Sequence, residues 1–456
     1  MSDFVEPPPV QTGVARVFRE SATLRLLGVG LLVLLLQVPI FMIGGLVSER
    51  QARRAAAIAD VSSKWGTSQT VIGPALALPY TARVVETAAS GLQIPRTEMR
   101  TAIVLPSTLH VRGTLDAENR TRGIFSIPVY RLKATIEGEF ARIAPSDLGV
   151  AASDVAWDRA HLVVGVTDVR AIQEQTVLTW NGRSVRFDPG VGRFVDAQTG
   201  LHADVPVDDA TGRFAFSFPL SLNGSVSLEM VPFAEETTVE IASNSPHPNF
   251  HGAWLPAQRT VSAGGFTAKW TIPFLGRNYP QAWTTVNMRD TILKSAFGVE
   301  LTDPVDYYRM ADRSVKYAAL FILLTFASVW LIEVLSDVRI HPIQYLLLGA
   351  ALCVFYLLEL SLAEHLGFGL AYAVAATSVL GLVAAYSMAI LHTAPQAAFV
   401  SSGVASLYGY LFVLLTNEDY ALLIGSVGLF LAVAGVMLLT RRVDWYAAGG
   451  AMRAAR

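Results

Sequence analysis

The 456-residue sequence is 52% hydrophobic and 16% charged, and its formal net charge at neutral pH is only −2. The apolar excess over an ordinary soluble protein predicts membrane-spanning segments. The nearly neutral charge gives no indication of nucleic-acid binding. The single cysteine, Cys353, lies in an apolar run. One cysteine per chain excludes both an internal disulfide framework and a cysteine-based metal site.

The N-terminal region predicts a tail and one membrane anchor. Residues 1–23 form a polar tail, and residues 24–47 form the first transmembrane helix. Within that helix, Leu26–Val47 runs 22 residues without a charge, or about 33 Å of helix, which is enough to cross a hydrocarbon core. The run is longer than a signal-peptide core and no small-x-small cleavage pattern directly follows it, so an uncleaved anchor is expected. Pro39 predicts a kink.

Residues 48–300 are predicted to form a β-rich α+β domain between the first and second membrane spans. After an amphipathic helical opening at 49–63, apolar and polar residues alternate and turn signals recur. The clearest predicted strands are TLHVRGTL, SIPVYRLKATIEGEF, RFAFSFPLSL and FTAKWTIPF. Asn181-Gly182 and Asn223-Gly224 each predict a hairpin turn. A sandwich with a few short helices, expected near residues 145–150 and 169–173, fits this pattern.

The segment Ser243–Trp270 is rich in prolines and aromatics and places His247 and His251 four residues apart. That spacing suits metal ligands on a helix, but Pro246 and Pro248 oppose a helix here. No nearby cysteine or dense carboxylate cluster would complete a metal site. A rigid surface loop is the favoured interpretation, and metal binding is the alternative.

Residues 301–446 predict an entrance helix and a five-helix transmembrane bundle, followed by a tail at 447–456. At its head, Asp303 is expected to cap the helix, Pro304 to occupy the first helical position and Asp306 to lie in the first turn. Five runs are long and apolar enough to span the membrane: residues 315–335, 343–363, 366–391, 397–416 and 420–440. With the anchor they make six spans, so both termini lie on the same side.

The short connectors predict the orientation of these spans. Cationic residues occur after the second span and after the last: Arg339, Arg441, Arg442, Arg453 and Arg456. The connectors at Glu364-His365 and at residues 417–419 contain no Lys or Arg. The positive-inside rule therefore predicts cytoplasmic termini and a periplasmic β-rich domain.

This topology would bring opposite charges together at the outer boundary of the bilayer. The entrance helix supplies three cations on one face, and two connectors supply acids and a histidine: Arg309, Arg313, Lys316, Glu364, His365, Glu418 and Asp419. Ion pairs in a partly dry layer could lock the β-rich domain onto the bundle. Separate snorkelling anchors and helix caps are the alternative.

The last span carries a stripe of small residues along one helical face: Ala421, Gly425, Gly428, Ala432 and Gly435. Such stripes let helix backbones approach closely in lipid, so a packing role is predicted in preference to a ligand channel. No charge occurs at mid-span, since Glu333 lies near the inner end and Glu359 near the outer end of their spans. This counts against an ion-coupled transporter.

Several sequence blocks carry a resemblance to a known family. They are Trp65-Gly66, Gly73-Pro74, Pro246-His247-Pro248 with Phe250, Val305-Asp306-Tyr307, Lys316-Tyr317, Leu320-Phe321, His341-Pro342-Ile343-Gln344-Tyr345, Phe355-Tyr356-Leu357-Leu358, Glu364-His365, Glu418-Asp419-Tyr420-Ala421-Leu422-Leu423 and Asp444-Trp445-Tyr446. With these blocks, which cover about residues 50–446, the chain resembles the CreD family of bacterial inner-membrane proteins. Glu359 and Ala363 depart from the family pattern, which has leucine and serine there, and His251 lies outside it.

The resemblance implies a multi-pass inner-membrane protein of cell-envelope integrity, tied to a two-component system, colicin tolerance and β-lactam stress. It brings no catalytic mechanism or substrate, and the phosphate-loop, nucleophile-elbow and H-E-x-x-H motifs do not occur. We therefore predict a non-enzymatic protein that contacts membrane lipids and an envelope-protein or cell-wall partner, with no nucleic acid, metal or cofactor. The alternatives are a transporter or lipid-handling protein, and a membrane-interface enzyme using Glu364, His365, Glu418 and Asp419.

Overall fold

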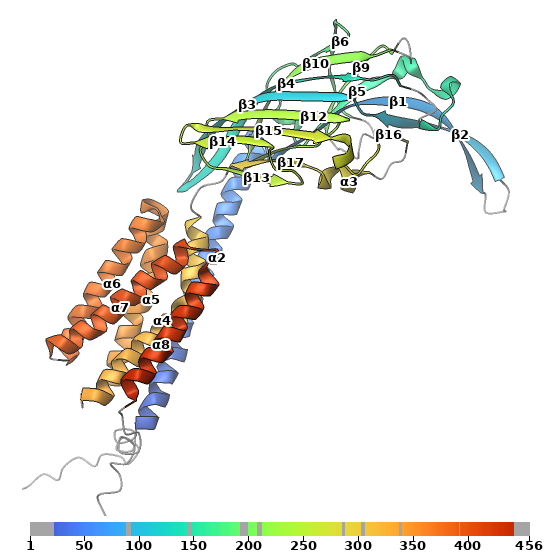
Figure 1. Cartoon of the computed structure of the whole chain (residues 1–456). Coiled ribbons are helices and arrows are strands. Elements are labelled where there is room, and N and C mark those ends of the chain that lie inside the picture. Colours follow the sequence, from blue (N-terminus) through green and yellow to red (C-terminus); the bar gives the residue numbers. More distant parts are fainter. Residues whose placement is uncertain are drawn as a thin grey trace, which may run out of the picture. The chain divides into compact units, whose positions relative to one another are not determined.

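The chain forms two compact units in the computed structural model (Figure 1): a helical unit within residues 1–53 and 305–456, and a β-rich unit at residues 54–304. The structure describes residues 22–87, 93–143, 148–191, 199–207, 212–284, 288–301, 306–336, 340–391 and 393–441.

Six long helices are described: α2 (Ala22–Trp65), α4 (Tyr307–Ser336), α5 (Pro342–Leu366), α6 (Phe368–Leu391), α7 (Ala394–Thr416) and α8 (Ala421–Thr440). All six contain a stretch long and apolar enough to cross a membrane, which confirms the six predicted spans. The anchor is longer than expected. It continues without a break through the predicted amphipathic helix at 49–63, so that α2 has 44 residues with Pro39 inside it.

The core of the helical unit is built by side chains from five helices. Buried residues from α2, α4, α5, α6 and α7 form one cluster, including Leu36, Phe326, Phe355, Tyr372 and Leu411. Three helices pack closely at Gly349 on α5, where an added Cβ would collide with Leu36 of α2 and Phe326 of α4. A glycine at this position therefore permits the close packing of three helices.

The start of α4 differs from the prediction. The Oδ1 atom of Asp306 accepts hydrogen bonds from the backbone N–H groups of Tyr308 (3.2 Å) and Arg309 (3.3 Å). Asp306 is therefore the N-cap and not a first-turn residue, because its carboxylate satisfies two backbone donors that a helix start leaves free. Asp303 and Pro304 lie outside the described residues.

The β-rich unit contains two sheets. The first has the order β13-β17-β11-β1-β5-β9-β8, with β2 paired to β1 and β16 to β2. Its strands are β1 (Gln69–Thr87), β2 (Gln93–Val104), β5 (His161–Val166), β8 (Asp188–Pro189), β9 (Gly200–Asp204), β11 (Ser227–Met230), β13 (Pro248–Gly252), β16 (Ala282–Trp283) and β17 (Phe297–Leu301).

The second sheet has the order β14-β15-β12-β3-β4-β10-β6-β7. Its strands are β3 (Thr108–Arg122), β4 (Phe125–Phe140), β6 (Val177–Trp180), β7 (Arg183–Arg186), β10 (Phe214–Ser225), β12 (Glu236–Ser243), β14 (Gln258–Ser262) and β15 (Gly265–Pro273). The unit's short helices are η2 (Ala152–Asp154), η3 (Trp157–Arg159), η4 (Val169–Ala171), η5 (Phe274–Gly276) and α3 (Arg289–Lys294). The predicted β-rich domain with a few short helices is confirmed.

One hydrophobic core joins the two sheets. It contains Leu76 and Val163 from the first sheet and Leu132, Trp180 and Trp270 from the second, each at most 1% exposed. The alternating pattern of the strands explains this arrangement, because every second side chain points to the same face.

The two Asn-Gly pairs adopt different structures. Asn181 (φ 45°) and Gly182 (φ 78°) connect β6 to β7 in a tight turn, as predicted. Asn223 and Gly224 instead lie within β10, where Gly224 pairs with Tyr130 of β4, so the second hairpin prediction is wrong. The Tyr130 ring packs against Gly224 and leaves no room for a Cβ. Here the long β4–β10 pairing overrides the local turn preference.

The predicted proline-set loop is also wrong in part, because much of Ser243–Trp270 is strand. β13 pairs with β17, and β14 pairs with β15. His251 lies on β13, with its Nδ1 atom 3.5 Å from Oε1 of Glu229. Among the described residues, no group of three His, Cys, Asp or Glu side chains is arranged to hold a metal ion.

Candidate functional site

A polar cluster of the helical unit gathers some of the residues singled out in the sequence. Glu418 follows α7, and its Oε2 atom lies 3.7 Å from Nη1 of Arg313 and 3.9 Å from Nη2 of Arg309. Both arginines belong to α4. These pairs therefore join two parts of the helical unit.

Arg313 also binds the end of α7. Its guanidinium donates hydrogen bonds to the backbone carbonyls of Leu414 (3.2 Å) and Leu415 (3.4 Å). The last carbonyls of a helix have no partner within the helix, and a cation is favourable at this end of the helix dipole. Only 15% of the Arg313 side chain is exposed, against 65% for Arg309. Arg313 thus fastens α4 to the C-terminal end of α7.

Glu364, at the end of α5, has partners that the sequence did not indicate. The hydroxyl of Tyr308 donates a hydrogen bond to its Oε1 atom (2.9 Å), and Nε of Arg50 lies 3.6 Å away. The Glu364 side chain is 8% exposed. Arg50 follows the apolar part of α2, so this carboxylate ties together α2, α4 and α5. A carboxylate held in this way fits a structural role.

The other residues of the predicted ion-pair layer, Lys316, His365 and Asp419, form no ion pair with Arg309, Arg313, Glu364 or Glu418 in the described part of the chain. Lys316 pairs with Asp312 on its own helix (2.6 Å). His365 and Asp419 are exposed and make no ion pair with the described residues. Of the seven residues, the cluster therefore unites Arg309 and Arg313 with Glu418, and Glu364 forms a separate contact.

Two residues of the small-residue stripe of α8, Gly425 and Gly428, lie toward α7. All five stripe residues, Ala421, Gly425, Gly428, Ala432 and Gly435, are of intermediate exposure, whereas α8 has no buried residue. Gly428 packs against the ring of Tyr410, whose hydroxyl donates to the carbonyl of Ile424. Gly425 lies close to Leu414. The absence of a side chain at Gly428 is what admits the tyrosine.

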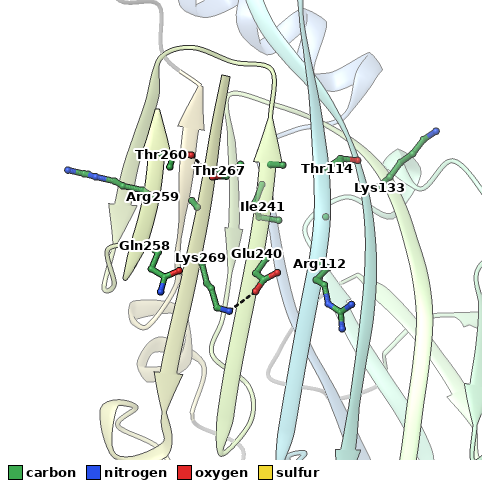
Figure 2. A pocket seen from close by; sticks show the side chains of 13 residues that line it. Arg112, Thr114, Lys133, Glu240, Ile241, Gln258, Arg259, Thr260, Thr267 and Lys269 are labelled. Atoms are coloured by element: carbon green, nitrogen blue, oxygen red, sulfur yellow. Dashed lines mark hydrogen bonds and ion pairs between the residues drawn. The ribbon is translucent and has the colours of Figure 1, made fainter. Parts of the chain in front are cut away.

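A separate feature, which sequence reasoning missed, is a trough of about 640 Å³ on the second sheet of the β-rich unit (Figure 2). The strand register explains it. One row of neighbouring residues across β14, β15, β12 and β3 has short side chains: Thr260, Thr267, Ala242 and Thr114. The adjacent row has long ones: Gln258, Lys269, Glu240 and Arg112. The trough follows the short row, and Lys133 of β4 stands beyond Thr114.

The trough carries an excess of positive charge. Lys269 and Glu240 form an ion pair at 2.7 Å, which holds the pKa of the Glu240 carboxyl below its usual range. Arg112 pairs with Glu137. Lys133 has no acidic partner in the described part of the chain, and Arg259 contacts only the face of Phe250. Figure 2 shows Lys133 and Arg259 pointing away from the Lys269–Glu240 pair. Hydroxyl groups and uncompensated cations suit a hydroxyl-rich, anionic ligand.

Comparison with known sequences places the chain in a family. The family profile described as "Inner membrane protein CreD" matches residues 21–446. The inner membrane protein CreD of Escherichia coli (strain K12) is 33% identical over 418 residues, which cover 91% of this chain and 92% of that protein. The chain belongs to the CreD family. The resemblance read from the sequence blocks is thereby confirmed.

This CreD-family protein is a multi-pass inner-membrane protein, with six candidate spans and a large β-rich domain between the first two. The family name is not that of an enzyme. Two solved structures give weak superpositions. A proposed protease from Parabacteroides distasonis has a TM-score of 0.24, 12% identity and coverage of 67% of this chain and 58% of that chain. Native yeast LTA4 hydrolase has a TM-score of 0.19, 10% identity and coverage of 76% and 67%. TM-scores this low do not indicate a shared fold.

Proposed function

We propose that this CreD-family protein supports cell-envelope integrity during stress, including β-lactam stress and exposure to colicins, by binding an envelope partner without catalysing a reaction. The observation that carries the proposal is the trough on the second sheet. A cavity of about 640 Å³ lies within the size range of ligand sites. The described clusters offer no nucleophile next to an oriented base, which an acyl- or phosphoryl-transfer site would need.

The partner's chemistry is inferred from the trough. The Thr260, Thr267 and Thr114 hydroxyls form one row, with Lys133 at its β4 end. Arg259, next to Thr260 on β14, pairs with Ala268 in the neighbouring row and contacts Phe250. A chain running across the strands would meet hydroxyls along its length and the Lys133 ammonium group at one end. We therefore propose an extended, anionic partner, such as a carboxylate-bearing cell-wall polymer or an acidic segment of an envelope protein.

We further propose that the β-rich unit faces the periplasm and that both termini are cytoplasmic. The absence of Lys and Arg from the connectors at residues 364–367 and 417–420, and the presence of Arg441 after the last span, support this orientation. In a Cys353→Ala background, a membrane-impermeant thiol reagent applied to whole cells should label Arg213→Cys and Glu418→Cys. Labelling of Glu418→Cys from the cytosol, with Arg213→Cys labelled from the periplasm, would overturn the topology.

The binding proposal is tested in cells whose only copy of the protein is the variant. Thr114→Arg fills the trough and Lys133→Glu reverses a free cation, so both should reduce survival under β-lactam stress at unchanged membrane level. Lys294→Glu is the matched control, because it makes the same charge change on α3, away from the trough. Equal survival of Lys133→Glu and wild type would contradict the proposal.

Photocrosslinking in intact cells reports the partner directly. A photoreactive residue at Thr267, inside the trough, should capture a partner, and one at the exposed Met99 of the first sheet should not. Adding Thr114→Arg should abolish the crosslink at Thr267. The same crosslinks from both positions would mean that the trough is not the binding surface.

A second candidate function, transport or lipid handling, is favoured by one observation. Glu359 of α5 is a fully buried carboxyl in a membrane-spanning helix. Ionisable groups within membrane spans often mark ion or proton pathways. A solvent-accessible route reaching Glu359, detected by labelling of Glu359→Cys, would support this function.

A further inference from the structure

The Glu359 carboxyl group has no cation to balance its charge. The residue is 0% exposed. Its Oε2 atom accepts a hydrogen bond from the hydroxyl of Ser314 on α4 at 2.7 Å, whereas its Oε1 atom is buried without a hydrogen-bond partner. Among the described residues, no Lys, Arg or His nitrogen forms an ion pair with it.

The nearest cations along the chain are occupied elsewhere. Arg313 precedes Ser314, but its guanidinium is directed to the end of α7 and to Glu418. Arg50 of α2 lies beside Glu364, more than one helical turn beyond Glu359 on α5. Neither guanidinium therefore neutralises the buried carboxyl.

The titratable groups around Glu359 on the neighbouring helices are uncharged at neutral pH. Tyr356 of α5, Tyr372 of α6 and Tyr408 of α7 lie close enough to interact electrostatically with it, and Cys353 lies near these tyrosines. The Tyr372 hydroxyl donates to the backbone carbonyl of Tyr408 (2.6 Å). The Tyr408 hydroxyl is buried without a partner, like Oε1 of Glu359. Four helices thus enclose two unsatisfied polar groups.

A lone carboxylate in such surroundings is strongly unfavourable, because several kcal/mol of hydration are lost with no ion pair in return. A divalent ion would require about six or more oxygen ligands, more than Glu359, Ser314 and Tyr408 supply together. A proton needs one oxygen, and once bound it turns the carboxyl into a hydrogen-bond donor.

We propose that Glu359 is a proton-binding site enclosed by α4, α5, α6 and α7, and that its proton exchanges with water that enters the site. In that step the carboxyl O–H bond breaks, the proton passes to an entering water molecule, and a hydrated carboxylate remains. The helical unit then responds to proton supply. This site is independent of the partner-binding trough, and either proposal can fail without the other.

Infrared spectroscopy of the full-length protein in nanodiscs tests the protonation state. The wild type at neutral pH should show the C=O band of a protonated carboxyl, and Glu359→Gln should lose it. Glu364→Gln is the matched control on the same helix, because Glu364 has a cation partner. Glu333→Gln shows how much of the band comes from Glu333, the other buried glutamate in the described part of the spans. Absence of the band from the wild type, or its persistence in Glu359→Gln, would overturn the proposal.

Proton counting gives a second, independent readout. On unfolding at neutral pH in weakly buffered detergent, the wild type should release about one proton more than Glu359→Gln, because the exposed carboxyl ionises. Glu364→Gln should release as many protons as the wild type. Equal release from the wild type and Glu359→Gln overturns the proposal. So does a requirement for Na⁺, seen as stabilisation of the wild type but not of Glu359→Gln when Na⁺ replaces choline.

Discussion

Replacing Arg313 by Met is expected to loosen the helical unit at the end of α7. The substitution keeps the long apolar stem and removes two hydrogen bonds, at 3.2 and 3.4 Å, to the carbonyls of Leu414 and Leu415. It also removes the 3.7 Å ion pair with Glu418. The α7 carbonyls would then lack their cationic partner in a site where Arg313 is mostly buried.

The expected loss follows from these contacts. A hydrogen bond from a charged donor contributes about 1.5–3 kcal/mol, but the two bonds are long and share one guanidinium. The ion pair adds only about 0–1 kcal/mol, because 58% of the Glu418 side chain is exposed. We therefore expect Arg313→Met to lower the free energy of unfolding by about 2–3 kcal/mol.

Reversible unfolding of the purified protein in mixed detergent micelles would measure this change, with Arg309→Met as the matched control. Arg309 approaches the same Glu418 but is 65% exposed, so its loss should change stability by no more than about 0.5 kcal/mol. Arg313→Glu should lower the free energy of unfolding more than Arg313→Met does. Adding Glu418→Lys to Arg313→Glu should recover only the part of the loss that comes from the ion pair. Equal losses from Arg309→Met and Arg313→Met, or full recovery by Glu418→Lys, would refute the helix-end explanation.

Two further predictions concern the β-rich unit. Gly224→Ala forces a Cβ against the Tyr130 ring and should destabilise the protein by about 1–3 kcal/mol in chemical denaturation. Gly264→Ala is the control, because its Cβ would meet only the Ser262 hydroxyl at an ordinary contact distance of 3.8 Å, and it should change the stability little. Similar effects of the two substitutions would contradict the packing argument. Paired hydrogen bonds from Arg170 (2.9 and 3.1 Å) hold the pKa of the Asp168 carboxyl below its ordinary value. The ionised Asp168 therefore stabilises the fold above about pH 3.9. This stabilisation is lost as the pH falls through the folded-state pKa of Asp168. Asp168→Asn should therefore flatten the acid limb of stability against pH, and an unchanged acid limb would show that Asp168 does not contribute to it.

The spans were predictable because uninterrupted apolar length is a local property of the sequence. Turn and loop predictions fared less well, as the two Asn-Gly pairs show. At Asn181-Gly182 the flanking strands are short, and the turn geometry prevails. At Asn223-Gly224 the pair belongs to a 12-residue strand in continuous register with β4, and cross-strand pairing decides the structure. The continuity of the anchor with the predicted helix at 49–63 was hidden by the change from apolar to charged residues.

The sequence predicted which polar residues lie near the membrane boundary, but it did not predict which of them contact one another. The approach of Arg313 to Glu418 follows from placing both near one end of the spans. The contacts of Glu364 with Tyr308 and Arg50 depend on how α2 packs, which no spacing in the sequence encodes. The trough likewise depends on the pairing of β12 with β3, which is distant in sequence, so its row of short side chains becomes visible only when the sheet is assembled.

The sparse contacts of α8 have a consequence for how freely its sequence can change. None of its residues is buried, and the contacts described above link it to α7. Most of its circumference is therefore exposed, and an exchange of leucine for valine or phenylalanine there replaces one exposed apolar group by another. Mutational tolerance should be broad around the helix and narrow at Gly428, where a methyl group would strike the phenol of Tyr410.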